Sequence, residues 1–345
     1  MIAVLAPGQG AQTPGMLAPW LELAGVAEQV ARFSELAGMD LIRLGTTADA
    51  DEIRDSAVTQ PLIVTMGLVT AGQLRLPGAT DGSAGGVESP GSVESAGSLE
   101  SAGGVVLAGH SIGEVTAAAV AGVLTAEQAI SFATRRGAAM AAACALTPTS
   151  MVAVVGGDPD EVVAAITSAG LTPANRNGSG QIVAAGAVEA IATLTENPPP
   201  RARVRPLQVA GAFHTSYMSP AEESLRAVAA QLQPSDPALT LLSNADGAVV
   251  GDGPTVLARL VGQVTRPVRW DRCLDTMRTL GVTGTIELAP AGTLTGIARR
   301  ELPGVQLVAV KTPADLESAQ RLLDEQAATP SGGPEAAPLA IGMSE

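Results

Sequence analysis

A serine between two glycines is the feature that most constrains how this chain folds. The sequence GHSIGE occupies positions 109–114, directly after the apolar run VVLA and directly before a stretch rich in alanine and valine. The apolar run predicts a short buried strand, and the small residues predict a helix packed closely on a sheet. The glycines remove Cβ atoms that would clash in so sharp a strand-to-helix turn. The pattern therefore predicts a nucleophile elbow at Ser111, with an ordinary turn serine as the alternative.

Histidines are scarce, which limits the candidates for a base that takes the proton of Ser111. The chain has two, His110 and His214. His110 is adjacent to the serine on a tight turn, so we expect it to point away and to make a structural hydrogen bond beneath the elbow. His214 ends the apolar run VAGAF, and functional residues of α/β folds gather where strands end. We predict His214 as the base; a buried histidine satisfied by the backbone is the alternative.

No acidic residue between Ser111 and His214 has the setting expected of a third catalytic group. In an α/β hydrolase that acid lies between the serine and the histidine in chain order. Five of the acids in this interval fall at the start, within or at the end of polar helical stretches: Asp158, Asp160, Glu161, Glu189 and Glu196. A dyad oriented by a backbone carbonyl is therefore at least as consistent with the sequence as a triad.

The N-terminus combines a second buried strand with a glycine-rich turn. The run IAVLA at positions 2–6 predicts the strand, and PGQGAQ follows at positions 7–12. Glycines let backbone N–H groups approach a ligand closely. Such a turn is able to supply one oxyanion donor, beside the N–H of Ile112 that follows the nucleophile. A plain loop between a strand and a helix is the alternative.

Composition favours an intracellular enzyme. The 345 residues, 46% of them hydrophobic, suffice for a large core and an inserted domain. Cys144 and Cys273 show no metal-binding spacing, so we expect no metal and no disulfide. The net charge of −14 argues against nucleic acid or an anionic membrane as a partner. With no signal sequence and no long apolar span, we expect a soluble cytoplasmic protein.

The middle of the chain predicts a second, smaller domain. From position 151 to 209 the pattern is strand, helix, strand, strand, helix, strand, with the last strand over 203–209, which is the ferredoxin-like order. Segment 85–104 has a six-residue period of glycine, serine and glutamate, and predicts a flexible loop. We therefore divide the chain as follows: a core of 1–145 and 210–325, a subdomain of 146–209, and a disordered tail of 326–345.

Several ordered motifs together resemble the malonyl-CoA:acyl carrier protein transacylases, particularly the stand-alone actinobacterial type. The resemblance runs from Ile2 to about residue 320. It rests on APGQGAQ at 6–12, GHSIGE at 109–114, RRG at 135–137, NRN at 175–177 with GQIV at 180–183, GAFH at 211–214, and GQV at 262–264 with PVRW at 267–270. It implies an α/β fold: an α/β-hydrolase-like core with an inserted small ferredoxin-like subdomain.

The resemblance also implies roles for individual residues. Ser111 is the acylated nucleophile, His214 its base, and the backbone carbonyl of Gln263 orients the histidine. The N–H groups of Gln9 and Ile112 form the oxyanion hole. Arg136 pairs with the malonyl carboxylate.

The physical chemistry of Arg136 agrees with that role. A capping box of Thr125 and Gln128 predicts the start of its helix, and a guanidinium fork matches a carboxylate. Arg135 is its neighbour on another helix face, and the sequence alone does not choose between them.

The expected substrate and partner raise an electrostatic difficulty, because malonyl-CoA and carrier proteins are anionic, as this chain is. A local basic patch must then overcome the net charge. We predict carrier-protein docking at Arg299 and Arg300; two other arginine groups, at 201–205 and 266–272, are alternatives. Each is also consistent with a solvated surface cluster.

The function expected is transfer of a malonyl group from malonyl-CoA to the phosphopantetheine thiol of acyl carrier protein, in fatty-acid or polyketide biosynthesis. No permanently bound cofactor is expected. The alternatives are a serine hydrolase such as a thioesterase, and a non-catalytic carrier-binding scaffold. Phe213 before the base, with Ile112 after the nucleophile, resembles the malonyl-selective pattern of related acyltransferase domains.

Overall fold

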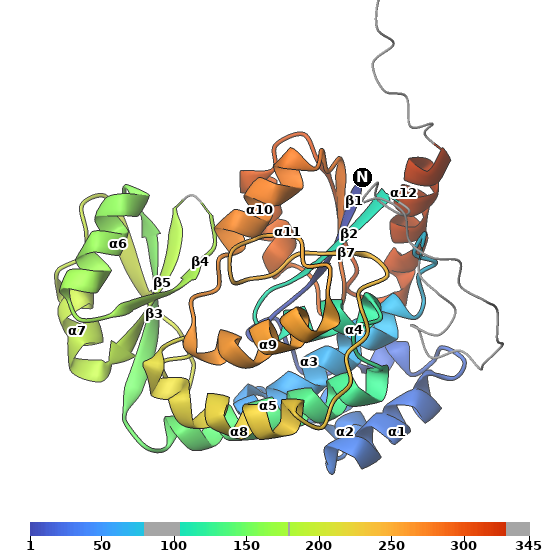
Figure 1. The fold of residues 1–345 in the computed structure, drawn as a ribbon, viewed down its shortest axis with the longest axis horizontal. Helices are drawn as coiled ribbons and strands as arrows, with labels where there is room; N and C mark the ends of the chain where they lie inside the picture. The colour runs from blue at the N-terminus through green and yellow to red at the C-terminus, as the bar shows by residue number, and fades with distance from the viewer. Residues whose placement is uncertain (79–103, 179, 329–345) are drawn as a thin grey trace, which may run out of the picture.

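The computed structural model describes residues 1–78, 104–178 and 180–328. Within them the chain forms a parallel sheet and, beside it, an antiparallel sheet (Figure 1). The parallel sheet has the strand order β7-β2-β1-β8-β9. Its strands are β1 (Ile2–Ala6), β2 (Val105–Gly109), β7 (Thr240–Leu241), β8 (Gly284–Glu287) and β9 (Gln306–Ala309). The α/β fold predicted from the sequence is confirmed.

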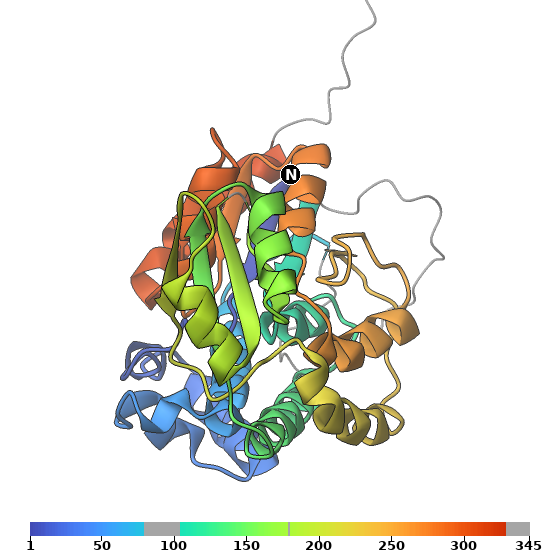
Figure 2. The same ribbon diagram turned by 90° about the vertical axis from the view of Figure 1, so that its left-hand side faces the viewer.

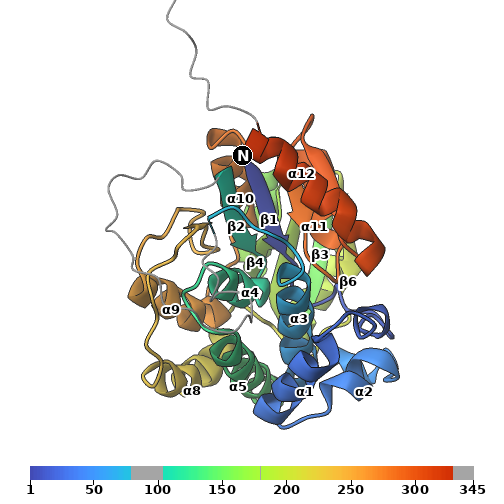
Figure 3. The ribbon, with the colours of Figure 1, turned by 90° about the vertical axis from the view of Figure 1, so that its right-hand side faces the viewer.

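Helices cover both faces of the parallel sheet. Every residue of β1 and β2 is buried, as expected for apolar runs in such a sheet. Ile2 and Val4 pack in one core cluster, whereas Ala3 and Leu5 point to the opposite face and pack in another. The first cluster includes α3 (Ser56–Ala71), α4 (Gly113–Val120) and α12 (Leu316–Ala328), and Figure 3 views the molecule from this side. The second includes α10 (Trp270–Thr279) and α11 (Thr293–Glu301).

The remaining helices of the core pack beside α3 and α4 or beside one another. They are α1 (Val26–Ala37), α2 (Leu41–Thr46), α5 (Ala126–Cys144), α8 (Ser219–Ala229) and α9 (Gly253–Gly262). Short 3₁₀ helices lie at η1 (Ala18–Trp20), η2 (Glu52–Arg54), η4 (Ser216–Met218), η5 (Gln263–Thr265) and η6 (Pro313–Asp315).

The antiparallel sheet is inserted between α5 and η4, and Figure 2 views the molecule from its side. Its order is β4-β5-β3-β6, the strand order of a ferredoxin-like sheet. Its strands are β3 (Thr149–Gly156), β4 (Thr172–Arg176), β5 (Gln181–Ala187) and β6 (Ala202–Pro206), and its helices are α6 (Pro159–Ser168) and α7 (Val188–Glu196). Val152 and Val154 pack against α6 and α7, whereas Met151 and Ala153 point to the other face.

Edge strand β4 joins the antiparallel sheet to the core. The N–H of Arg176 donates to the carbonyl of Val268 at 2.9 Å, and the N–H of Val268 donates to the carbonyl of Ala174 at 2.8 Å. This parallel bridge precedes α10 and holds Asn175 beside the core. The two sheets are therefore linked by backbone hydrogen bonds close to the elbow.

Three sequence predictions differ from the structure or lie outside it. The strand predicted over 203–209 ends at Pro206, and the N–H of Leu207 makes one further hydrogen bond to the carbonyl of Met151 at 3.1 Å. His214 therefore follows an irregular segment rather than a strand. The tail predicted from residue 326 is helical as far as Ala328, where α12 ends. The remainder of that tail, and the predicted loop 85–104 apart from Gly104, lie outside the described residues. No helix in the described ranges is long and apolar enough to cross a membrane.

Candidate active site

The predicted elbow is present where β2 meets α4. Ser111 has a φ of +54°, in the left-handed region. A Cβ on Gly109 would lie 2.0 Å from the backbone of Gly113, and one on Gly113 would lie 2.2 Å from the carbonyl oxygen of Ala6. Only glycine fits at either position, so the two glycines of the motif are required by the close approach of backbone to backbone.

His214 contacts Ser111 on one side and a backbone carbonyl on the other. Its Nε2 lies 2.8 Å from the Oγ of Ser111, and its Nδ1 lies 2.8 Å from the carbonyl oxygen of Gln263. In the described part of the chain, no carboxylate forms a hydrogen bond with His214. The geometry is that of a dyad whose histidine is oriented by a carbonyl.

Burial controls the charge of both histidines. Desolvation, and after it the positive charge of Arg136, lower the pKa of His214 to about 3. The ring is therefore neutral near pH 7, and Nε2 is available to accept a proton. Burial also lowers the pKa of His110, whose Nε2 lies 2.8 Å from the Oδ1 of Asn177. Its ring lies edge-on to Trp270 with centroids 5.6 Å apart. His110 makes a hydrogen bond away from Ser111, as predicted, but it also lines the cavity above the serine rather than lying wholly beneath the elbow.

Arg136, not Arg135, faces the site. The predicted capping box of Thr125 and Gln128 starts α5, and this helix leaves Arg135 exposed while Arg136 is only 1% exposed. The Nη1 of Arg136 donates to Gln60 Oε1 at 2.7 Å, and its Nη2 donates to Gln263 Oε1 at 2.9 Å. Nη2 also lies 3.4 Å from the Oγ of Ser111. Burial lowers the pKa of Arg136 to about 10, so the guanidinium remains charged at neutral pH.

Two buried residues at the site were missed by the sequence analysis. Asn244 accepts the N–H of Ser111 at 2.8 Å and donates to the carbonyl of Gly109 at 2.7 Å, which clamps the elbow from behind. Glu114 accepts the N–H of Asn244 at 3.1 Å and the side-chain amide of Gln263. Burial raises the pKa of Glu114 to about 7. An acid directly after the elbow, in an otherwise apolar helix, was the available signal.

A cavity of about 220 Å³ opens above the serine, between the core and the antiparallel sheet. Ser111, His214 and Phe213 line it from the core, with Gln9 of the N-terminal turn. The antiparallel sheet contributes Met151, Ala153, Asn175, Gln181 and Val183. Among the described residues, the backbone N–H groups of Gln9 and Ile112 donate to no protein acceptor. Both donors are therefore available to a bound ligand.

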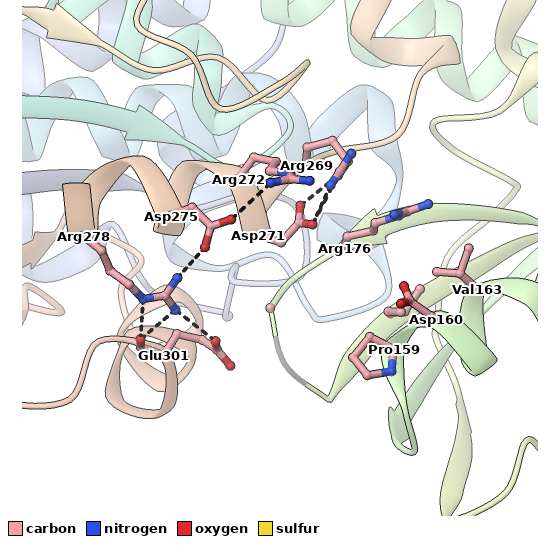
Figure 4. A pocket seen from close by; sticks show the side chains of 12 residues that line it. Pro159, Asp160, Val163, Arg176, Arg269, Asp271, Arg272, Asp275, Arg278 and Glu301 are labelled. Atoms are coloured by element: carbon pink, nitrogen blue, oxygen red, sulfur yellow. Dashed lines mark hydrogen bonds and ion pairs between the residues drawn. The ribbon is translucent and has the colours of Figure 1, made fainter. Parts of the chain in front are cut away.

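A second pocket, of about 270 Å³, lies on the other side of β4 (Figure 4). Its arginines are largely neutralised within the pocket: Arg269 pairs with Asp271 at 2.8 Å, and Arg272 lies 3.6 Å from Asp275. Arg278 pairs with Asp275 and with Glu301. This pairing weakens the case for the 266–272 group as a free basic patch.

Other arginines remain exposed. Arg299 and Arg300 lie in the last turn of α11, and in the described ranges neither forms an ion pair. Residues near the N-terminal end of the same helix, Thr293, Leu294 and Ile297, line the cavity. Carrier docking at Arg299 and Arg300 stays a prediction, which charge reversal followed by carrier-dependent kinetics would test.

Known proteins resemble this chain over almost its full length. The acyl transferase domain family model matches residues 4–314. The malonyl CoA-acyl carrier protein transacylase of Mycobacterium tuberculosis is 50% identical, covering 93% of this chain and 100% of that protein. That of Mycolicibacterium smegmatis is 47% identical, covering 89% and 100%.

Comparison with solved structures gives the same result as comparison of sequences. The crystal structure of MCAT from Mycobacterium tuberculosis has a TM-score of 0.83 and 50% identity, covering 93% of this chain and 99% of that one. A malonyl-transacylase in complex with its type II PKS acyl-carrier protein has a TM-score of 0.80 and 26% identity, covering 93% and 99%. The family model, the identity of the mycobacterial relatives and the shared fold agree, and this chain belongs to the malonyl-CoA–acyl carrier protein transacylase family.

Proposed function

We propose that this protein transfers a malonyl group from malonyl-CoA to the phosphopantetheine thiol of an acyl carrier protein, through an acyl-serine intermediate. The observation that carries the proposal is the position of the Ser111 hydroxyl, 2.8 Å from His214 Nε2 and 3.4 Å from the guanidinium of Arg136. A nucleophile beside a buried cationic fork suits an acyl group that carries a free carboxylate. The names of the mycobacterial relatives support the donor, and the carrier-protein complex supports the acceptor.

In the acylation half-reaction, His214 Nε2 takes the proton of Ser111 as Oγ attacks the thioester carbonyl. The Gln263 carbonyl accepts from Nδ1–H and stabilises the imidazolium that forms. The N–H groups of Gln9 and Ile112 then hold the oxyanion of the tetrahedral intermediate. The C–S bond breaks, His214 returns its proton to the departing coenzyme A sulfur, and malonyl-Ser111 remains.

The second half-reaction reverses these roles. The carrier thiol loses its proton to His214 and its sulfur attacks the ester carbonyl of malonyl-Ser111. The C–O bond to Ser111 breaks, and the serine oxygen takes the proton back. These steps use only protein groups and the two substrates.

Product analysis tests the proposed function against thioester hydrolysis. The protein is mixed with malonyl-CoA and a carrier protein that bears its phosphopantetheine arm, and both products are measured. We expect malonyl-carrier to form much faster than free malonate. Malonate as the main product would indicate a thioesterase, and no turnover would indicate a scaffold.

Replacing Arg136 with alanine should impair malonyl transfer far more than acetyl transfer. Of the two acyl groups, only malonyl has a carboxylate that would lose its partner. A hydrogen bond to a charged group contributes about 1.5–3 kcal/mol, which corresponds to about 10- to 150-fold in kcat/KM. The measurement compares malonyl-CoA with acetyl-CoA. Exposed Arg135→Ala is the matched control and should keep the wild-type ratio. Equal losses with both donors would make Arg136 structural.

Phe213 is 6% exposed and lines the cavity, where we propose that it limits bulk on the malonyl α-carbon. One methyl group changes discrimination by about 1–3 kcal/mol in an apolar pocket. We expect the wild type to prefer malonyl-CoA over methylmalonyl-CoA, and Phe213→Ser to narrow that preference by improving methylmalonyl transfer. An unchanged ratio of kcat/KM values would remove Phe213 from the specificity pocket.

A further inference from the structure

A buried carboxylate lies behind the cavity and takes no part in the steps proposed above. Glu114 is 3% exposed, lies in the first turn of α4 and does not line the cavity. Its Oε1 accepts the N–H of Asn244 at 3.1 Å, and its Oε2 accepts the Nε2 of Gln263. Both oxygens of the carboxylate are therefore committed to donors that are distant in the sequence.

These contacts decide which way the amide of Gln263 points. Its Nε2 donates to Glu114 and, at 3.2 Å, to the Oδ1 of Asn244. Its Oε1 accepts from Arg136 Nη2 at 2.9 Å. The opposite orientation would place the amide oxygen against two acceptors and the amide nitrogen against the guanidinium, which also only donates. Glu114 and Asn244 thus select the orientation in which Gln263 accepts from Arg136.

We propose that Glu114 is a positioning residue for the acyl pocket: by holding the amide of Gln263, it turns the Oε1 of that side chain toward Arg136 and fixes the guanidinium for the malonyl carboxylate. The inference rests on the proposed function. It gives the side chain of Gln263 a task separate from that of its backbone carbonyl, which accepts from His214.

In its ionised form Glu114 also supports the ionisation of buried Arg136 by its negative charge. This second role predicts the opposite result, and the measurements are made above pH 8, where a carboxyl with a pKa of about 7 is ionised. If Glu114 acted only as a counter-charge, removing its charge would strengthen the attraction between Arg136 and the malonyl carboxylate. If Glu114 positions the guanidinium, removing the hydrogen bonds of Glu114 weakens the contact between Arg136 and the malonyl carboxylate. An acetyl group has no carboxylate for Arg136 to bind, so the rate of acetyl transfer serves as the internal reference.

Two variants separate the roles. Glu114→Gln removes the charge and offers only one accepting end, so one of the two donors loses its partner. Glu114→Asp keeps the charge, but its side chain is one methylene shorter, so its oxygens lie farther from Asn244 and Gln263. The measurement is single-turnover formation of the acyl-enzyme, followed by intact mass, with malonyl-CoA and with acetyl-CoA. Glu127→Gln, at an exposed acid in the first turn of α5, is the matched control.

We expect both Glu114 variants to lower the malonyl-to-acetyl rate ratio by about 5- to 20-fold, the effect of one weakened buried hydrogen bond to a charged group. Glu127→Gln should leave the ratio unchanged. A raised ratio in Glu114→Gln with an unchanged ratio in Glu114→Asp would identify a counter-charge and overturn the proposal. An unchanged ratio in both variants would overturn it too.

Thermal unfolding shows whether each variant is folded. If neither Glu114 variant folds, Gln263→Leu takes their place, because it removes the amide and keeps the backbone carbonyl that His214 uses. The same fall in the ratio is expected, and an unchanged ratio contradicts the proposal. Failure of the proposed function has a different signature, since the wild-type protein would then form no malonyl adduct.

Discussion

Replacing Ser111 with alanine should abolish the covalent malonyl adduct. Wild-type protein mixed with malonyl-CoA is expected to gain the mass of one malonyl group, because the Ser111 hydroxyl lies 2.8 Å from the Nε2 of His214, its proposed base. The variant has no oxygen at this position to form the ester, and the other described contacts of the cavity remain. Intact mass spectrometry after rapid mixing measures the yield directly.

The matched control for this experiment is Ser168→Ala, at an exposed serine that ends α6. It should form the adduct with wild-type yield. A wild-type yield in Ser111→Ala as well would place the acyl group on another residue and remove the elbow from the mechanism.

Replacing His214 with alanine should slow acylation by about 10²- to 10⁴-fold, the usual contribution of a general base. Among the described residues, no second base is in place to take over from His214. The Nε2 of His110 is hydrogen-bonded to Asn177, and no carboxylate bonds to His214. Single-turnover acylation by malonyl-CoA measures the effect, and circular dichroism verifies the fold.

Added imidazole supplies a second readout for this variant. If the cavity left by the missing ring admits imidazole, acylation should recover in proportion to its concentration, which a purely structural defect would not do. Near-normal acylation in His214→Ala without imidazole would exclude this residue as the base.

The elbow and its base were predictable because their signals are local. The spacing of glycines around Ser111 reflects a close approach of backbone to backbone, because a Cβ added at Gly109 or Gly113 would lie only 2.0–2.2 Å from neighbouring backbone atoms. Scarcity of histidine then left His214 as the candidate. The segment before His214 was assigned to a strand incorrectly, since apolar content alone does not reveal that the strand ends at Pro206.

The surroundings of the site were less accessible to sequence reasoning because they depend on long-range packing. The choice between Arg135 and Arg136 depends on how α5 is rotated against the core, which periodicity in that segment did not fix. Glu114 meets Asn244 and Gln263 across 130 and 149 positions of the chain. The resemblance supplied only the backbone role of Gln263, and its amide was found in the folded structure.

The central claim, that malonyl transfer passes through Ser111, is tested most directly by a two-step mass measurement. Wild-type protein is first mixed with malonyl-CoA alone, and the acylated peptide is located after digestion. Carrier protein bearing its phosphopantetheine arm is then added. We predict one malonyl group on Ser111 in the first step, and its complete movement to the carrier thiol in the second. An adduct elsewhere, or transfer to the carrier without any enzyme-bound malonyl, would contradict the account.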